Sequence, residues 1–329
     1  MLNFTCEIVP VVLEKHPNAD SLSIVKVFDA YQVVVRTEDW LDRNVGVYIP
    51  PDSVVPDTEQ FNFLEGHFRI KAKRLRGEES YGLLIPVPDN GRAGNIGDNL
   101  TEILGIQHYE PEMSAIVGQF GLTGACSSPP PIPGWIYDIE PWQKYKREFV
   151  EGEEVVITEK IHGTNSRYTF QDGKMWCGSH KLWKKDDNNL YWSMLERVPW
   201  IQAFCQLNPN VILYGEIFGA IQKDYNYGST SDNPYQFRAF DVYAGGKFLD
   251  YESALGGARS DFLVPLLYRG PYSDEIVQRL VNGPSTIEDA KHIREGIVIK
   301  PVKERYNNRL HGRLILKYVS IDYLEGKKK

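Results

Sequence analysis

The chain has 329 residues, of which 42% are hydrophobic and 25% are charged, the composition of an ordinary globular protein. This length favours two domains over one. The net charge of −7 argues against a protein that coats nucleic acid, because nonspecific binding depends on neutralising many phosphates. It does not argue against an enzyme that grips a few phosphates in a local basic groove.

Targeting and redox features point to an intracellular protein. No apolar run reaches the roughly 18 residues of a membrane-spanning helix, and the N-terminus lacks the pattern of a signal peptide. The four cysteines are scattered, without a Cys-x-x-Cys pair or a Cys/His cluster of zinc spacing, which favours free thiols in a reducing compartment. We therefore expect a protein of the cytoplasm or nucleus that does not bind membranes.

Residues 1–87 are predicted to form short β-strands separated by turn residues. Only Thr37 to Leu41 offers a brief helix. The predicted strands are Phe4 to Leu13, Ser23 to Phe28, Gln32 to Arg36, Val45 to Ile49, Phe68 to Leu75 and Gly82 to Pro86. A series of short strands of this kind suggests a small barrel.

Two stretches of this region, His16 to Leu22 and Leu75 to Leu84, resemble the turns that bound strands in OB-fold domains of the tRNA-binding type. The resemblance implies a partly open five-stranded barrel. Within it, Arg69, Lys71 and Lys73 alternate with apolar residues, so the three cations share one strand face. That face could carry a phosphate backbone, and the alternative is an ordinary solvated strand face.

A Gly- and Pro-rich stretch separates this region from the rest of the chain. Residues 88–134 lose the alternation and end in a proline run over 127–134, which favours an extended, semi-rigid spacer. We therefore predict an OB-fold-like domain over 1–105, a linker over 106–134 and a second domain over 135–329.

The second domain has a mixed α+β pattern with two predicted helical regions. Leu190 to Leu207 is predicted to be a helix interrupted near Pro199. Ser273 to Val281 is predicted to be a helix with Ser273 at its N-cap, acidic residues in its first turn and Gly283 after its end. Strands are expected around them.

Lys160 follows the strand-forming run Val155 to Thr158 and precedes Gly163, so its amine can lie at a strand end against a tight turn. That position suits a lysine nucleophile, although a surface lysine beside a hairpin glycine is the commoner meaning of Lys-x-x-Gly alone. Four later segments change this balance, because each joins an apolar strand to a charged residue that is costly to bury unpaired. These segments are Val211 to Glu216, Phe237 to Val242, Glu295 to Lys300 and Arg313 to Tyr318.

Taken in order, the lysine segment and the four later segments resemble motifs I, III, IIIa, IV and V of the covalent nucleotidyltransferases, the superfamily of ATP-dependent ligases and RNA-capping enzymes. The run Lys160 to Asn165 resembles the RNA ligase 2 branch, because other branches usually have an acidic residue where His162 stands. The similarity spans about residues 137–320. It implies an α+β, ATP-grasp-like nucleotidyltransferase domain with antiparallel sheets and flanking helices.

The resemblance implies an ATP-dependent RNA ligase that works in three steps. Lys160 attacks the α-phosphorus of ATP, AMP passes to the 5′-phosphate of an RNA strand, and a 3′-hydroxyl displaces AMP to seal the break. Each step requires in-line positioning and neutralisation of negative charge, so Mg²⁺ or Mn²⁺ is expected.

The roles of the family carry over to the matching residues as expectations. Lys300 and Lys317 would contact the α-phosphate and, with the metal ion, lower the pKa of Lys160. Glu216 and Glu295 would lie near the metal ion and the ribose. The other expected nucleotide-binding residues are Glu159, Ile161, Asn165 toward the ribose and Phe240 stacked on adenine.

Some positions depart from the family pattern. His180 stands where motif Ia often has an arginine, with Lys181 beside it, and either side chain could contact the nucleic acid. Motif V lacks its second lysine, and Arg313 is the nearest other cation upstream. His162 could act as a general base, but its place before a glycine favours a role in shaping the turn.

Two acidic positions raise further questions. Glu295 and Lys300 are five residues apart, which puts them on opposite faces of a regular strand. If both serve one site, Gly296 marks an irregular strand start. Asp241 could be part of the site or a partner in a surface salt bridge.

The leading interpretation is a monomeric enzyme that repairs nicks in which the 3′-OH strand is RNA. A DNA ligase or a capping guanylyltransferase would share the lysine chemistry, and labelling by ATP or GTP separates these functions. A noncatalytic RNA-binding protein on a ligase-like scaffold is the alternative from another class. The presence of both motif acids and of the three motif lysines argues against it.

Overall fold

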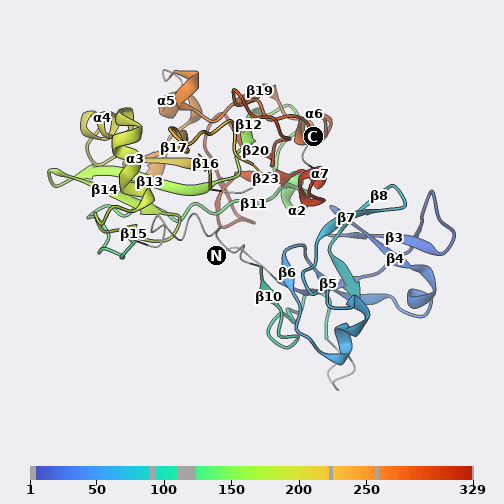
Figure 1. Ribbon diagram of the computed structural model, residues 1–329. Coiled ribbons are helices and arrows are strands. Elements are labelled where there is room, and N and C mark those ends of the chain that lie inside the picture. The colour runs from blue at the N-terminus through green and yellow to red at the C-terminus, as the bar shows by residue number, and fades with distance from the viewer. Residues whose placement is uncertain (1–4, 89–93, 110–123, 222–224, 256–258, 328–329) are drawn as a thin grey trace. The chain divides into compact units, whose positions relative to one another are not determined.

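The computed structural model describes residues 5–88, 94–109, 124–221, 225–255 and 259–327. The chain divides into two compact units, one made by Met1–Pro111 with Leu324–Lys327 and the other by Glu112–Tyr323 with Lys328–Lys329. Strands dominate both units (Figure 1). None of the helices in the described ranges is long and apolar enough to cross a lipid bilayer. The four cysteines are free, as predicted.

The first unit contains a counterpart of every predicted strand. Its strands are β1 (Glu7–Pro10), β2 (Glu14–Lys15), β3 (Leu22–Val27), β4 (Tyr31–Arg36), β5 (Val45–Ile49), β6 (Ser53–Val54), β7 (Ala72–Leu75), β8 (Glu78–Tyr81), β9 (Leu83–Ile85) and β10 (Gln107–His108). The predicted brief helix is the 3₁₀ helix η1 (Thr37–Trp40), and a second one, η2 (Glu59–Leu64), was not predicted. Phe4, where the first strand was predicted to start, lies outside the described residues.

The predicted barrel, a partly open one, is confirmed only in part. The strands pair as β1-β5-β9, β2-β3-β4, β7-β8 and β10-β6, and none of these sheets closes on itself within the described residues. Proline explains part of the interruption, because it has no N–H to donate to a ladder. β1 ends at Pro10, and β5 is followed directly by Pro50 and Pro51. An apolar core that includes Ile8, Val47 and Phe61 still fills this unit.

The predicted basic strand is present only in part. Ile70 and Ala72 are buried while Lys71 and Lys73 are exposed, so the predicted alternation is confirmed. Arg69 precedes β7, and its guanidinium lies 2.7 Å from Asp52 Oδ1 and 3.5 Å from the centre of the Tyr109 ring. Two of the three cations are therefore exposed to solvent, and the third is already paired.

A six-stranded antiparallel sheet forms one half of the second unit. Its order is β15 (Trp183–Lys184), β14 (Lys174–Ser179), β13 (Thr164–Gln171), β16 (Ile212–Gly219), β17 (Tyr235–Ala244) and β18 (Lys247–Phe248). Helices α3 (Leu190–Arg197) and α4 (Pro199–Leu207) pack on it through buried residues such as Met194 and Ile201 (Figure 1). The predicted interruption is confirmed, because Pro199 begins a new helix instead of continuing the first.

A five-stranded sheet forms the other half. Its order is β11 (Glu140–Pro141), β23 (Leu316–Val319), β20 (Gly296–Pro301), β12 (Glu154–Lys160) and β19 (Leu266–Pro271). Helix α6 (Asp274–Val281) buries Ile276, Val277 and Val281 against this sheet, and the Ser273 hydroxyl accepts the Ile276 N–H as its predicted cap. The smaller elements are α2 (Trp142–Tyr145), η3 (Lys146–Glu148), α5 (Tyr251–Leu255), η4 (Ser260–Phe262), β21 (Tyr306–Asn307), β22 (Gly312–Arg313) and α7 (Ile321–Leu324).

The described end of the predicted linker packs on the six-stranded sheet. The Ile132 N–H donates to the side-chain oxygen of Gln171 at 2.8 Å, and the Gln171 side-chain amide donates to the Ile132 carbonyl at 2.9 Å. Near the start of the predicted second domain, the Trp135 N–H and carbonyl both bond the Tyr214 hydroxyl, at 3.0 and 2.9 Å, and Tyr137 is buried in an apolar cluster with Tyr214. The end of the predicted semi-rigid spacer therefore belongs to the packing of the second unit.

Candidate active site

Three lysines share one face of the five-stranded sheet. Lys160 ends β12, Lys300 of β20 lies opposite Val156 of β12, and Lys317 of β23 lies opposite Val298 of β20. The alternation of side chains along each strand and their pairing across strands put all three on the same side. Lys300 is four residue positions from Lys160 along the ladder, about 13 Å at the usual rise of a strand.

The Lys160 ammonium is bound by an acid. Its Nζ lies 2.6 Å from Glu295 Oε1, and the two side chains are 24% and 11% exposed. Glu216 of β16 also acts on this charge from the other sheet. The lysine that the sequence marks as a nucleophile therefore faces two carboxyl groups at the end of its strand.

Burial and charge set the protonation of this trio. Burial by itself lowers the pKa of Lys160, but the attraction of Glu295 and Glu216 outweighs burial and raises it. Burial raises the pKa of Glu216 to about 8, with repulsion from Glu295 adding to the effect of burial. For Glu295, burial is outweighed mainly by the charge of Lys160, and its pKa falls to about 2. At neutral pH, Lys160 and Glu295 are an ion pair and Glu216 is protonated.

The sequence-based expectation for Lys160 included a metal ion. Cations, the metal ion among them, were expected to lower its pKa, whereas among the protein's own charges the nearest groups are acids and the pKa is raised. Lys300 is remote along the ladder and has its own acidic partner. The Lys160 amine is therefore protonated and forms an ion pair with Glu295.

Two glycines allow the close approach of the site segments. A Cβ on Gly163 would lie 2.1 Å from the Ile217 carbonyl oxygen, and a Cβ on Gly296 would lie 2.1 Å from the Tyr318 carbonyl oxygen. β20 starts at Gly296, so Glu295 precedes the regular strand. This irregular start explains how Glu295 can reach Lys160 despite its odd spacing from Lys300.

His162 is tied into the turn after Lys160. Its backbone N–H donates to the Tyr227 hydroxyl at 2.7 Å, and its Nδ1 lies 2.8 Å from the Tyr323 hydroxyl. The ring packs against Tyr225 and Tyr323 with centroid distances of 5.5 Å. These contacts support the predicted role in shaping the turn.

Asn165 and Glu216 face each other across β13 and β16. The carboxyl group of Glu216 accepts a hydrogen bond from the backbone of Gly163, which joins it to the turn after Lys160. Asn165 Oδ1 and Glu295 Oε2 are buried and have no hydrogen-bond partner among the described residues. Buried acceptors without a partner are uncommon and require an explanation such as a ligand.

Glu159 lies on the other face of β12 from Lys160, and its carboxylate is fully engaged. It accepts the Ser285 hydroxyl at 2.6 Å and both the N–H and the hydroxyl of Thr286 at 2.7 Å. Ile161 is 3% exposed and packs with Phe218 and other apolar residues. The side chains of Glu159 and Ile161 thus support the strand end, and any nucleotide contact they make would come from their backbone.

A buried ionic network surrounds Asp241, which is fully buried and so is not a surface salt-bridge partner. Its carboxylate accepts from Lys300 Nζ at 2.9 Å, from Arg313 at 2.6 Å and from the Tyr137 hydroxyl at 2.6 Å. Arg313 also pairs with Glu304. Burial raises the pKa of Asp241, but the charges of Lys300 and Arg313 outweigh this and lower it.

This network changes the reading of two predicted residues. Lys300 is 6% exposed and held by Asp241, which favours a structural role over the predicted phosphate contact. Arg313 is likewise occupied, so it does not replace the second motif V lysine in this state. Lys317 is half-buried and lies two residue positions along the ladder from Lys160. Of Lys300, Arg313 and Lys317, it is the cation best placed to contact a phosphate beside Lys160.

Phe240 lies in the apolar cluster between the two sheets. Its ring packs 4.7 Å from the ring of Tyr137, and Val298 of β20 belongs to the same cluster. A register shift in the pairing of β16 with β17, between Tyr214 and Gly215, falls beside it. Stacking of the Phe240 ring on a base stays a prediction.

His180 and Lys181 follow β14, whose last residue, Ser179, pairs with Ser166 of β13. His180 Nε2 lies 3.1 Å from Asp138 Oδ1, and burial is the main cause that lowers the pKa of His180. Lys181 is exposed. Of the two candidates for a nucleic-acid contact, Lys181 is the more accessible cation.

The oxygen atoms near Lys160 suit a divalent metal ion only if a bound ligand supplies further oxygen atoms. No group of three or more His, Cys, Asp or Glu side chains that could hold a metal gathers in the described part of the chain. Glu216 and Glu295 nevertheless offer oxygen atoms beside the unpartnered Asn165 oxygen. Mg²⁺ is commonly held by one or two carboxylates together with substrate phosphates and water. Glu216 and Glu295 match this pattern.

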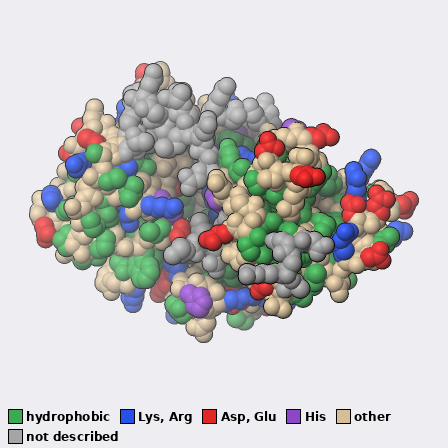
Figure 2. Space-filling model, turned by 90° about the horizontal axis from the view of Figure 1, so that it is seen from below, with side chains coloured by type: hydrophobic (Ala, Val, Ile, Leu, Met, Phe, Trp, Pro, Cys, Tyr) green, Lys and Arg blue, Asp and Glu red, His purple; other side chains and the backbone are tan. Residues whose placement is uncertain are grey.

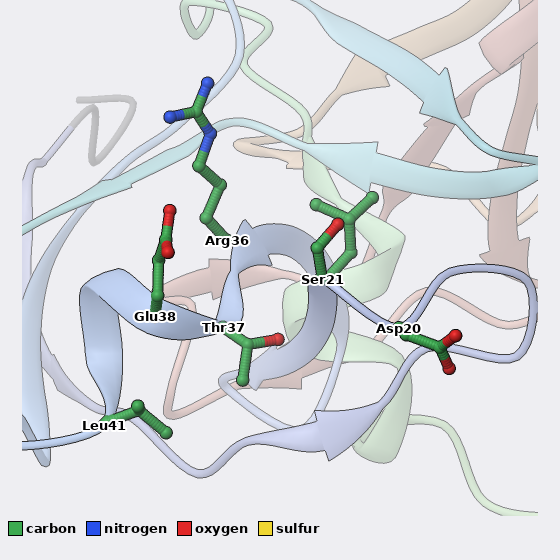
Figure 3. A pocket seen from close by; sticks show the side chains of 7 residues that line it. Asp20, Ser21, Arg36, Thr37, Glu38 and Leu41 are labelled. Carbon is green, nitrogen blue, oxygen red and sulfur yellow. The ribbon is translucent and has the colours of Figure 1, made fainter.

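A separate hollow of about 410 Å³ lies in the first unit and is unsuited to a nucleotide (Figure 3). Its charged lining consists of Asp20, Arg36 and Glu38, and Figure 3 shows the side chains of Arg36 and Glu38 pointing the same way. Two carboxylates against one guanidinium would repel a triphosphate. None of the predicted site residues lies there.

The candidate site is thus a lysine at a strand end that faces two acids, between two mostly antiparallel sheets. Residues 153–319 match the family model described as RNA ligase, and residues 7–87 match a model described as an OB-fold domain. The chain therefore belongs to the RNA ligase family, a family of enzymes, and carries an N-terminal OB-fold domain. No curated protein matches the chain.

Solved structures with the same fold include those of the Naegleria gruberi RNA ligase. A lysine-to-alanine mutant with ATP and Mn has a TM-score of 0.79, 23% identity and 98% coverage of both chains. The same ligase with PPi has a TM-score of 0.79, 24% identity and 99% coverage of both chains. A glutamate-to-alanine mutant with AMP and Mn has a TM-score of 0.79 and 23% identity, and covers 98% of this chain and 99% of that chain. The likeness extends over both units.

The protonation of Glu216 leads to a prediction on stability. Its pKa in the folded protein, about 8, exceeds that of an exposed glutamate, so the folded state binds more protons than the unfolded state between these values. Ionisation of Glu216 in the unfolded chain therefore weakens the fold as the pH rises to about 8. Glu216→Gln should raise the free energy of unfolding, and its advantage should grow by about 2 kcal/mol from pH 6 to pH 8.

Urea unfolding at pH 6 and pH 8 measures this difference. Glu196→Gln, which replaces an exposed glutamate of α3, is the matched control and should show the same stability as the wild type at both values. If the advantage of Glu216→Gln is the same at both pH values, then Glu216 is already ionised at pH 6, against this account.

Proposed function

We propose that this chain is an ATP-dependent RNA ligase of the RNA ligase 2 branch, which joins 3′-OH and 5′-phosphate ends through a lysyl-adenylate on Lys160. The observation that carries the proposal is the buried pair of Lys160 and Glu295 in a chain of the RNA ligase family. Burying charges costs stability unless each is well paired, so a shielded lysine facing two acids requires a reason. Nucleophilic attack on a nucleotide supplies that reason.

In the first step, the Lys160 amine forms a bond to the α-phosphorus of ATP while the bond to pyrophosphate breaks. The amine must first lose a proton, and the resting pair with Glu295 opposes that loss. Glu216 and Glu295 would hold Mg²⁺ or Mn²⁺, whose charge would neutralise both acids and the phosphates. With the acids neutralised, burial alone would act on Lys160 and lower its pKa.

Other residues of the site would orient the nucleotide. Lys317, on the same sheet face as Lys160, would contact the α-phosphate. Asn165, whose buried oxygen has no partner in the described structure, would bond the ribose, and Phe240 would stack on adenine. In the later steps, AMP would move to the RNA 5′-phosphate, and the 3′-hydroxyl would displace AMP and form the new phosphodiester bond.

RNA would be held by local cations. On the face shown in Figure 2, Lys and Arg side chains are interspersed with Asp and Glu, in keeping with the net charge of −7. Lys71 and Lys73 of the OB-fold domain and Lys181 of the catalytic domain are exposed and would contact phosphates. We assign these roles to domains at 1–105 and 135–329, joined by 106–134, in a monomer that repairs nicked RNA or RNA–DNA hybrids.

Sealing of four nicked duplexes, with RNA or DNA on each side of the nick, tests the proposal. We expect sealing in the presence of ATP and Mg²⁺ or Mn²⁺ wherever the 3′-OH strand is RNA, and weak sealing where it is DNA. Equal sealing of an all-DNA nick would favour a DNA ligase. Labelling by GTP and not by ATP would favour a capping guanylyltransferase, and the absence of any labelling would favour a noncatalytic RNA-binding protein.

A further inference from the structure

The first turn of α7 and Glu295 are joined by two routes. The backbone N–H of Ser320 donates to the Glu295 carbonyl oxygen at 2.8 Å. Ser320 is 1% exposed, and its hydroxyl donates to Asn282 Oδ1 at 2.6 Å. On the side-chain route, the Tyr323 hydroxyl lies 2.8 Å from His162 Nδ1, and Nδ1 lies 3.8 Å from Glu295 Oε2. The start of α7 is therefore fixed beside the carboxylate that binds Lys160.

The tautomer of His162 decides which atom donates in its contact with Tyr323. His162 Nδ1 lies 3.8 Å from Glu295 Oε2, too far for a hydrogen bond, and Oε2 is a buried oxygen with no hydrogen-bond partner among the described residues. In one of the two possible arrangements, the Tyr323 hydroxyl donates and Nδ1 accepts, which places the ring proton on Nε2.

We propose that Tyr323 is a positioning residue for the adenylylation step, a role that rests on the proposed ligase function. Its hydroxyl occupies His162 Nδ1 and so prevents the imidazole from donating to Glu295. One oxygen of the Glu295 carboxylate then stays bonded to Lys160. The other accepts no hydrogen bond from a protein donor and is open to the incoming ligand. Without the hydroxyl, Nδ1 can carry a proton and bond Oε2, which would pull Glu295 from its position beside the nucleophile.

The substitution Tyr323→Phe removes only the hydroxyl. The ring packs on His162 at 5.5 Å and on Tyr225 at 4.9 Å, contacts that phenylalanine retains. In single-turnover labelling by ATP, we expect the maximal rate to fall about tenfold and the half-saturating ATP concentration to change by less than about threefold, as for partners that orient catalytic groups. In a His162→Asn background, the same substitution should have no further effect on the rate.

The tautomer of His162 gives a second readout without ATP or metal. In ¹⁵N-histidine spectra, with the signal assigned by its loss in His162→Asn, we expect Nδ1 to be unprotonated in the wild type and partly protonated in Tyr323→Phe. Tyr306→Phe, at a side chain 65% exposed in β21, should match the wild type in both assays. Thermal unfolding checks that both variants are folded.

An unchanged maximal rate in Tyr323→Phe overturns the proposal, and so does a protonated Nδ1 in the wild type. If the wild-type protein is not covalently labelled with AMP, the proposed function is wrong. In that case, the tautomer measurement still decides whether Tyr323 holds His162.

Discussion

Lys160→Ala is expected to abolish covalent labelling by ATP, with a loss of at least about 10³-fold, because no other side chain can replace a nucleophile that forms the covalent bond. Lys160→Arg should be equally inactive. The guanidinium stays protonated at any accessible pH, so it cannot attack, although it can still pair with Glu295. Gel electrophoresis under denaturing conditions after incubation with labelled ATP measures both variants.

The control for this prediction is Lys247→Ala, which removes an exposed lysine from β18 of the same unit. It should be labelled at the wild-type rate. Lys160→Arg also separates chemistry from folding, because it keeps the positive charge beside Glu295 and should unfold near the wild-type temperature. Labelling of Lys160→Ala at even a tenth of the wild-type rate would rule out Lys160 as the nucleophile.

Asp241→Asn is expected to cause the largest loss of stability. Lys300, 6% exposed, and Arg313, 16% exposed, would then share Glu304 as their one acidic partner among the described residues. Breaking a buried ion pair on one side typically costs about 3–5 kcal/mol, because the remaining charge is buried and uncompensated. Urea unfolding measures the difference from the wild type.

Asp261→Asn is the matched control, because Asp261 pairs with Arg259 at the surface, where the side chains are 49% and 75% exposed. Solvent screens such a pair, and its removal should hardly alter the unfolding midpoint. If Asp241→Asn were as stable as this control, the network would contribute little to the fold. Lys300 would then be free for the phosphate contact predicted from the sequence.

The core of the site was predictable because its main residues lie in short sequence segments. Lys160 and Gly163 are three residues apart, and the close approach of Gly163 to Ile217 explains why a glycine is needed there. Asn165 and Glu216 meet because adjacent antiparallel strands bring equivalent faces together. Their assignment to a nucleotide is still a prediction.

The parts that escaped prediction depend on distant partners. Glu159 looked like a nucleotide ligand, yet it is held by Ser285 and Thr286, more than a hundred positions along the chain. In the sequence, the only sign of these contacts was the pair of hydroxyl residues, Ser285 and Thr286, shortly after Gly283. Lys300 was assigned to phosphate because nothing in its own strand reveals that Asp241 lies beside it.

The direction of the Lys160 pKa shift among the protein's own charges was also hard to predict, for a physical reason. The sequence shows which charged residues exist, but the nearest charge decides the shift, and that charge is Glu295 at 2.6 Å. The strands of the first unit were largely predictable from alternation. Their division into separate sheets was not, because it depends on which edges pair across the unit.

The site of AMP attachment tests the central claim most directly. The full-length protein is incubated with ATP and Mg²⁺ or Mn²⁺ and digested, and the modified peptide is sequenced by mass spectrometry. The account predicts one adenylyl group, attached to Lys160 through an acid-labile phosphorus–nitrogen bond. An adenylyl group on another residue, or none in protein that binds ATP, would contradict it.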